Sequence, residues 1–370
     1  MFSENKLLNI KASFPHLNAW IMKKVKRYRF LQIAIPIFLM PLLCTIIACN
    51  GQAVFHGTLL ALSKANRTLA LVDPTTLNII ARIPVGADPH EVIASADGRT
   101  AYVSIYGGGS MHELNVIDLV AQKPLPNIDT RPLFGPHGLT FADGKVWFSA
   151  EGSKAVGRYD PATGKLDWSM GTGQDRTHMI YVTADGKKIY TTNVSSGTVS
   201  ILVDTLIPPG KLAPPDAKPR EDWVQTVVPT VRGSEGFDVS PDGRELWTAS
   251  SEDGTISIID LGAKKLAAKI DSRVTGANRL KFTPDGKQVF ISSLQTGELT
   301  IIDATSHKEV KRLKLGKGAA GILMDPEGSR AFVACSADNY IAVISLKTLE
   351  VTQHLDVGGV PDGLAWAVKH

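Results

Sequence analysis

A short turn signal recurs along this chain at nearly constant intervals, and it limits the fold more than any other feature. Each copy is an Asp-Gly pair, weakened to Glu-Gly in the last, and the glycines are Gly98, Gly144, Gly186, Gly243, Gly286 and Gly328. The steps between them are 46, 42, 57, 43 and 42 residues. Four-stranded propeller blades repeat about every 40 to 45 residues. The spacing therefore predicts a propeller, with an insertion in the long step, where a proline-rich segment runs from Pro208 to Pro219.

Each repeat carries the same order of strand-like segments. The turn is followed by a β-rich run, such as AYVS at 101–104 or IYTTN at 189–193, and then by an "x-I-x-Asp" segment. β-Branched and aromatic residues between Gly, Asp and Asn turns are typical of strands. No helical periodicity of useful length follows residue 55. We therefore expect an all-β fold.

The two ends of the repeat region complement each other. Six full units cover roughly residues 85–357. Residues 57–84 supply three strands without an innermost one, and Pro361–Val368 supplies an innermost strand with nothing after it. Pairing them makes a seventh blade and removes the sheet edges that would otherwise be exposed. The prediction is a seven-bladed β-propeller with four-stranded blades over residues 54–370, its ring closed by N-terminal strands pairing with the C-terminal innermost strand.

From about residue 57 to the end, the chain resembles the YVTN-repeat family of seven-bladed propellers, which includes YncE-like and surface-layer proteins. The repeat motif has its counterparts in Tyr102-Val-Ser-Ile and in Tyr190-Thr-Thr-Asn193. The resemblance implies the fold. It leaves function open, since similar propellers act as binding platforms, surface-layer proteins, redox subunits, lactonases and streptogramin lyases. Residues 136–165 resemble one streptogramin lyase repeat.

The N-terminal 53 residues have the layout of an export signal. The apolar run FLQIAIPIFLMPLLCTIIA at 30–48 follows a basic stretch that begins at Met22, which is a candidate for the true start. Ile46-Ile47-Ala48-Cys49 also resembles a bacterial lipobox, in which Cys49 is lipidated, and the alternative is cleavage near Ala53. Either way we expect the mature chain in the periplasm or cell envelope, with the membrane contacted only through the signal or a lipid anchor.

Charge and cysteine content exclude two classes of protein. The net charge of +4 is concentrated in residues 1–48, and the remainder holds 33 basic and 35 acidic groups. A nearly neutral domain does not favour nucleic-acid binding. Three cysteines are too few for a disulfide scaffold, and Cys335 in a strand-like run is expected to be a buried small side chain. We expect a monomer.

The turns also locate the residues at the mouth of the central channel. In a propeller the loops that enter the innermost strands open there. Counting back six or seven positions from each of the six turns, or from the equivalent position in the last blade, gives one residue per blade: His90, His137, His178, Glu235, Asn278, Ala320 and Asp362. Three imidazoles and a carboxylate on successive blades suit a transition metal, namely zinc, copper or iron. The alternatives are that His90, His137, His178 and Glu235 satisfy backbone groups at the rim, or that they contact an organic ligand directly.

Further candidates for ligand binding lie on the same face. They are Tyr106, His112, Glu151, Arg176, Asn193, Glu252, Asn278 and Asp362. His112 follows a glycine-rich loop that could fold over the mouth. Arg131, Arg176 and Arg279 flank the mouth residues and could hold a carboxylate or phosphate.

Three functions are compatible with these residues. The first is an exported binding module for a small ligand, a metal or an envelope protein, favoured because no CxxC, HExxH, nucleophile elbow or P-loop occurs. The second is a lactonase-like or lyase-like enzyme that uses a metal at His90, His137, His178 and Glu235, with Glu151 or Glu252 as base. The third is a subunit of a redox complex, whose cofactor would be noncovalent because no CxxCH is present.

Overall fold

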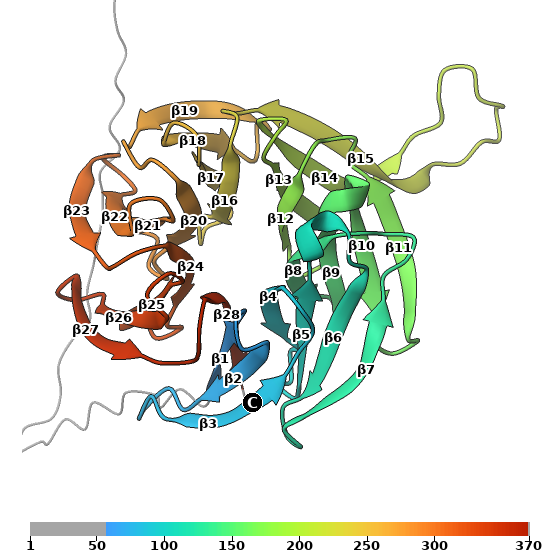
Figure 1. Ribbon diagram of the computed structural model, residues 1–370. Coiled ribbons are helices and arrows are strands. Elements are labelled where there is room, and N and C mark those ends of the chain that lie inside the picture. Colours follow the sequence, from blue (N-terminus) through green and yellow to red (C-terminus); the bar gives the residue numbers. More distant parts are fainter. Residues whose placement is uncertain (1–56, 369–370) are drawn as a thin grey trace, which may run out of the picture. The chain divides into compact units, whose positions relative to one another are not determined.

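The computed structural model describes residues 57–368, which form seven four-stranded antiparallel sheets around a central channel (Figure 1). The innermost strands are β4 (Pro89–Ala94), β8 (Pro136–Ala142), β12 (Thr177–Val182), β16 (Ser234–Val239), β20 (Ala277–Phe282), β24 (Ala319–Met324) and β28 (Pro361–Val368). The second strands are β5 (Thr100–Ile105), β9 (Lys145–Ala150), β13 (Lys188–Asn193), β17 (Glu245–Ser250), β21 (Gln288–Ser293), β25 (Arg330–Cys335) and β1 (Gly57–Ser63). This arrangement confirms the predicted seven-bladed propeller.

The outer half of each blade follows the same order. The third strands are β6 (Glu113–Asp118), β10 (Ala155–Asp160), β14 (Thr198–Ile207), β18 (Thr255–Asp260), β22 (Glu298–Asp303), β26 (Tyr340–Ser345) and β2 (Thr68–Val72). The outermost strands are β7 (Lys123–Asp129), β11 (Lys165–Gly171), β15 (Arg220–Pro229), β19 (Lys265–Asp271), β23 (Glu309–Lys314), β27 (Glu350–Leu355) and β3 (Ile79–Pro84). Two short 3₁₀ segments, η1 (Gly107–Gly109) and η2 (Glu151–Ser153), follow second strands.

Burial along the blades explains the sequence pattern. The second strands are buried at almost every position, because each blade is covered by a neighbour on both faces. Their side chains include the largest fully buried ones, such as Trp147, Trp247 and Phe290. The outermost strands β11 and β19 instead alternate exposed and half-buried residues, as expected where one face meets solvent. Cys335 is fully buried, as predicted.

The Asp-Gly turns join innermost to second strands. In the first, Gly98 has φ +65°, and Asp97 Oδ1 accepts hydrogen bonds from Ser95 Oγ at 2.6 Å and from the Arg99 amide at 3.1 Å. These bonds stabilise the charged carboxylate, so they lower the pKa of Asp97. The Asp residue therefore recurs because its side chain organises the turn, and the Gly because the turn needs a positive φ.

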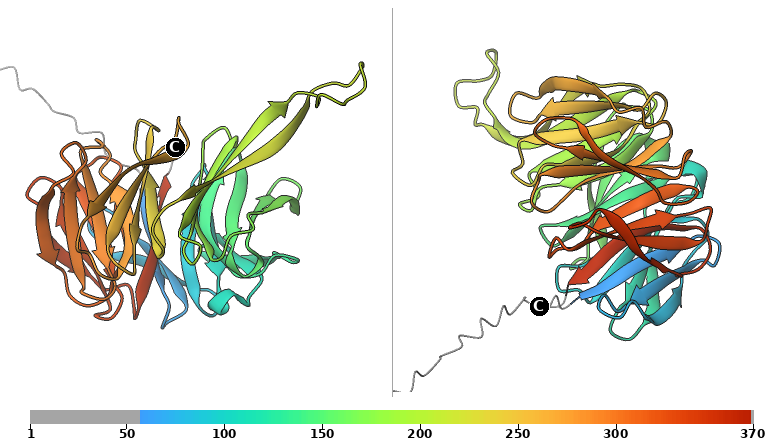
Figure 2. Two further views of the ribbon diagram at one scale, coloured as in Figure 1. Left: turned by 90° about the horizontal axis from the view of Figure 1, so that it is seen from above. Right: turned by 90° about the vertical axis from the view of Figure 1, so that its left-hand side faces the viewer.

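The ring closes as predicted. β1 pairs with β28 from Gly57 opposite Val368 to Ser63 opposite Pro361. The long step contains an extended hairpin: β14 and β15 each have 10 residues and stay paired out to Ile207 and Arg220. Figure 2 shows this hairpin projecting beyond the other blades.

The predicted export signal, Met22, Cys49 and Ala53 lie outside the described residues. Within residues 57–368, the structure contains no helix with the length and apolar character needed to cross a membrane.

Candidate functional site

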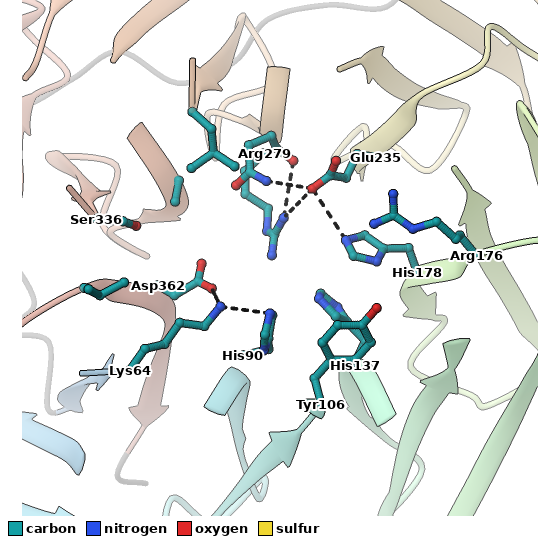
Figure 3. A pocket seen from close by; sticks show the side chains of 14 residues that line it. Lys64, His90, Tyr106, His137, Arg176, His178, Glu235, Arg279, Ser336 and Asp362 are labelled. Carbon is teal, nitrogen blue, oxygen red and sulfur yellow. Dashed lines mark hydrogen bonds and ion pairs between the residues drawn. The ribbon is translucent and has the colours of Figure 1, made fainter. Parts of the chain in front are cut away.

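A cavity of about 310 Å³ lies at the mouth of the central channel (Figure 3). The second residue of every innermost strand lines it, and these are the seven residues found by counting from the turns: His90, His137, His178, Glu235, Asn278, Ala320 and Asp362. The repeat thus places one side chain per blade at a common centre. Tyr106, Arg176 and Arg279, also proposed from the sequence, line it too, together with Lys64 and Ser336.

A residue with positive φ precedes each innermost strand and turns the chain into the channel. Four blades use glycine there, and three use a residue with a side chain: Asp88 (φ +58°), Arg176 (φ +56°) and Val360 (φ +52°). A left-handed conformation costs a non-glycine residue about 1 kcal/mol or more. Arg176 and Val360 line the cavity, and Asp88 contacts His90. In three blades the protein therefore adopts a strained backbone conformation at a residue whose side chain lies at the mouth of the channel.

His178 lies between two buried carboxylates. Its Nδ1 is 2.6 Å from Glu151 Oε2, and its Nε2 is 3.6 Å from Glu235 Oε1. Burial disfavours a charged imidazole, but the hydrogen bond with Glu151 and the charges of both carboxylates outweigh it and raise the pKa of His178. Burial likewise opposes ionisation of Glu151, yet its contacts with His178 lower its pKa to about 2. An imidazolium thus donates to Glu151 through Nδ1–H, and Tyr106 Oη donates to the same carboxylate.

The three histidines form a stack. The ring centroid of His137 is 3.8 Å from that of His178 and 4.8 Å from that of His90. Complete burial, with the positive charge of His178 next, lowers the pKa of His137 well below its usual value. His137 is therefore neutral.

Lys64, which sequence reasoning did not identify, anchors the other end of the stack. Its ammonium is 2.8 Å from both His90 Nε2 and Asp362 Oδ2. Because the ammonium can only donate, His90 Nε2 accepts, and Nδ1–H donates to the Asp88 carbonyl at 3.2 Å. Burial and the Lys64 charge lower the pKa of His90, so this ring is neutral.

An ion pair closes the bottom of the cavity. Arg279 on β20 binds Glu91 on β4 through a hydrogen bond between its terminal nitrogen and Oε1; the Arg279 side chain is buried and that of Glu91 is 14% exposed. These strands belong to blades on opposite sides of the ring (Figure 1). A second cavity of about 250 Å³ lies further along the channel and shares Arg279 with the first. The mouth is thus a pocket with a charged floor.

Three polar atoms of residues that line this pocket make no hydrogen bond to any described residue. They are His137 Nδ1, His178 Nε2 and Asn278 Oδ1. Their residues are 2%, 4% and 6% exposed. A buried polar atom without a hydrogen bond costs roughly 1–3 kcal/mol. Their concentration around one cavity is the clearest sign of a binding site in the described chain.

Four candidates from the sequence do not reach the cavity. His112 is 41% exposed in its side chain and pairs with Asp129 at 3.2 Å. Arg131 is exposed and pairs with the same Asp129. Glu252 is exposed and pairs with Arg232. Asn193 is fully buried inside its blade, where its amide donates to Thr198 and Ser200. Asn193 thus joins β13 to β14.

Glu91 was also missed, although a signal for it exists. It is the third residue of its innermost strand, where four blades have glycine: Gly138, Gly236, Gly321 and Gly363. Arg279 holds the same position in its own strand. Two blades thus have opposite charges, Glu91 and Arg279, at the strand position where four other blades have glycine. This pattern indicates an ion pair across the channel.

The histidines are not arranged as metal ligands. Between residues 57 and 368 no group of three His, Cys, Asp or Glu side chains is placed to hold a metal ion. His137 and His178 face each other with their rings rather than directing nitrogens to a common point, and Glu151 occupies His178 Nδ1. The residues in this arrangement do not fit a zinc, copper or iron centre, and such a centre stays a prediction.

Comparisons with known proteins agree with the fold. Residues 215–330 match the family model of the YNCE-like beta-propeller. A putative 6-phosphogluconolactonase from Bacteroides fragilis superposes with a TM-score of 0.68 at 16% identity, covering 85% of this chain and 99% of that one. Hydrazine synthase from Kuenenia stuttgartiensis gives 0.64 at 16% identity, covering 78% and 92%. The dihydro-heme d1 dehydrogenase NirN gives 0.57 at 16% identity, covering 83% and 74%. These likenesses show the fold, and no curated protein matches the sequence.

Proposed function

We propose that this seven-bladed β-propeller, which matches the YNCE-like model over residues 215–330, is a binding module that holds a small polar organic molecule at the mouth of its channel. The observation that carries the proposal is the set of unpartnered buried atoms around the cavity, on His137, His178 and Asn278. These atoms are available for hydrogen bonds with a ligand in the cavity.

The shape of the cavity supports a small molecule rather than a protein partner. Its volume of about 310 Å³ lies in the range of ligand pockets. The unpartnered atoms lie below the rim on residues at most 6% exposed, where the surface of another folded protein does not reach. The ion pair of Arg279 and Glu91 gives the pocket a floor.

We also propose that the module works outside the cytoplasm. The support is the basic stretch and apolar run before residue 49 and the lipobox-like sequence that ends at Cys49. Determining the N-terminus and lipid content of the mature protein tests this location. An unprocessed N-terminus would contradict it.

Binding can be tested by thermal unfolding of the purified propeller with a panel of amino acids, hydroxy acids, dicarboxylates, sugar acids and polyols. We expect at least one compound to raise the Tm of the wild type. The rise should be lost in Asn278→Leu and kept in the control His112→Ala, which lies outside the cavity. No shift with any compound, or an equal shift in Asn278→Leu, would overturn the proposal.

A further inference from the structure

We infer that the ligand is a free α-amino acid with an apolar side chain, its carboxylate held by Arg176 and His178 and its ammonium by Asn278 and Glu235. This inference rests on the proposed function and specifies the chemistry of the same site. Four features of the cavity support it: its free donors, its free acceptors, its charges of both signs and its apolar wall.

The free donors come from the start of β12. Arg176 binds Glu151 through Nε at 3.3 Å, and its terminal nitrogens make no hydrogen bond to any described residue. His178 lies two residues further, and its Nε2 makes no hydrogen bond, with Glu235 Oε1 3.6 Å away. A guanidinium with free nitrogens matches the two oxygens of a carboxylate. Figure 3 shows Arg176 and His178 side by side at the edge of the cavity.

The free acceptors lie next to these donors, on β16 and β20. Asn278 donates its amide to Glu235 Oε1 at 2.7 Å and leaves Oδ1 unpartnered. The same Oε1 takes the ion-pair contacts of Glu235, with His178 at 3.6 Å and Arg279 at 3.9 Å. No hydrogen bond from the described chain reaches the second oxygen of Glu235. An ammonium group would bind both free acceptors and would neutralise a carboxylate whose cationic neighbours lie beyond direct hydrogen-bond distance.

Charges of both signs line or border the cavity. Lys64, Arg176 and Arg279 line it together with Glu235 and Asp362. Asp88, Glu91 and Glu151 form ion pairs with these three cations. A ligand that carries one charge of each sign can therefore pair each of its charges with an opposite charge of the protein.

The wall across the channel from β12 is apolar. It is formed by Leu294, Ala320 and Val360, which belong to or border the blades of β20, β24 and β28. Leu294 and Val360 are 45% and 38% exposed, so a ligand in the cavity can contact their apolar surface. A polar head group bound at Arg176 and Asn278 would direct an apolar side chain toward this wall.

Isothermal titration with L-leucine, L-valine, L-methionine and L-phenylalanine tests the inference, together with two analogues of leucine. 2-Hydroxy-4-methylpentanoate lacks the ammonium, and leucinol lacks the carboxylate. We expect at least one amino acid to bind, and we expect each leucine analogue to bind at least tenfold more weakly than leucine.

The variant Arg176→Gly separates binding from folding. Glycine is the residue that four sister blades use at this positive-φ position, so the variant should keep its Tm. It should bind the amino acid at least tenfold more weakly, while the control Arg232→Ala, at an exposed surface pair, should bind normally.

The outcomes distinguish this inference from the proposed function. If a hydroxy acid or a polyol binds better than every amino acid and Asn278→Leu abolishes that binding, the inference fails and the binding module stands. If amino acids bind equally well to Arg176→Gly, the inference fails. If no compound of either panel binds, both fail.

Discussion

His178 shows how this propeller holds a charge in a buried place. The side chain is 5% exposed, and burial alone would drive its proton off. Two carboxylates from neighbouring blades, Glu151 and Glu235, reverse that preference. The neutral His137 stacked against it adds no competing charge. The protein thereby keeps an N–H donor pointing into a cavity that water and ligand can enter.

The protonation of His178 can be measured directly by NMR titration of the imidazole. We expect its pKa above the ordinary value of 6.5 and that of His137 well below it. Glu151→Gln removes the closest carboxylate and should lower the pKa of His178. A pKa of His178 that is unchanged in Glu151→Gln would contradict the assignment, and Glu252→Gln, at an exposed pair, serves as control.

Glu151 should also make stability depend on pH. Its pKa is lowered from 4.5 to about 2, so its stabilising contribution is complete above pH 4.5 and is lost as the pH falls toward 2. Between pH 6 and pH 3 the wild type should lose about 2 kcal/mol more unfolding free energy than Glu151→Gln. Urea unfolding of both proteins at the two pH values measures this difference. Equal losses would show that Glu151 is not held ionised by its neighbours.

The innermost strands fit together because glycine recurs at their third position. A Cβ on Gly363 would lie 2.4 Å from the His90 carbonyl oxygen, and one on Gly138 would lie 2.8 Å from that of His178. Backbone thus contacts backbone between neighbouring innermost strands. This close approach sets the positions of the cavity residues, each of which directly precedes this site in its strand.

Gly363→Ala tests that role. The new methyl group must push β28 away from β4, where Asp362 and His90 are both joined to Lys64. We expect a loss of about 2 kcal/mol in unfolding free energy, the usual cost of overpacking. Gly171→Ala is the matched control, because a Cβ there meets nothing within 4 Å and its φ is not positive. Equal stability of the two variants in urea unfolding would refute the argument.

The blades and the ring of residues at the mouth could be predicted from the sequence, because both follow from the spacing of the turns along the chain. The Asp-Gly turn fixes where each innermost strand begins, and so it found residues such as His90, Glu235 and Asp362. It could not find contacts between distant blades. Lys64 reaches His90 only after the ring has closed, and Arg279 reaches Glu91 across 188 residues of sequence. Asn193 was misplaced because strand position does not reveal which face a polar side chain takes.

The ring as a whole is held by contacts of two kinds. Neighbouring blades bury large side chains between their faces, for example Trp247 and Ile291 in one apolar cluster. The pair of Arg279 and Glu91 differs, since it joins strands that are not neighbours and crosses the channel. It therefore couples the stability of the two halves of the ring at the binding cavity.

A double-mutant cycle on this pair measures that dependence. Glu91→Leu leaves the guanidinium of Arg279 buried without its main partner, and Arg279→Met does the same to the carboxylate, so each should cost about 3–5 kcal/mol of unfolding free energy. The double variant should return to within about 1 kcal/mol of the wild type, because an apolar pair removes both buried charges. The surface pair of Arg232 and Glu252, with side chains 70% and 56% exposed, should show a coupling free energy of at most about 1 kcal/mol in the same cycle. A coupling across the channel no larger than this surface value would mean that the floor of the cavity does not join the two sides of the ring.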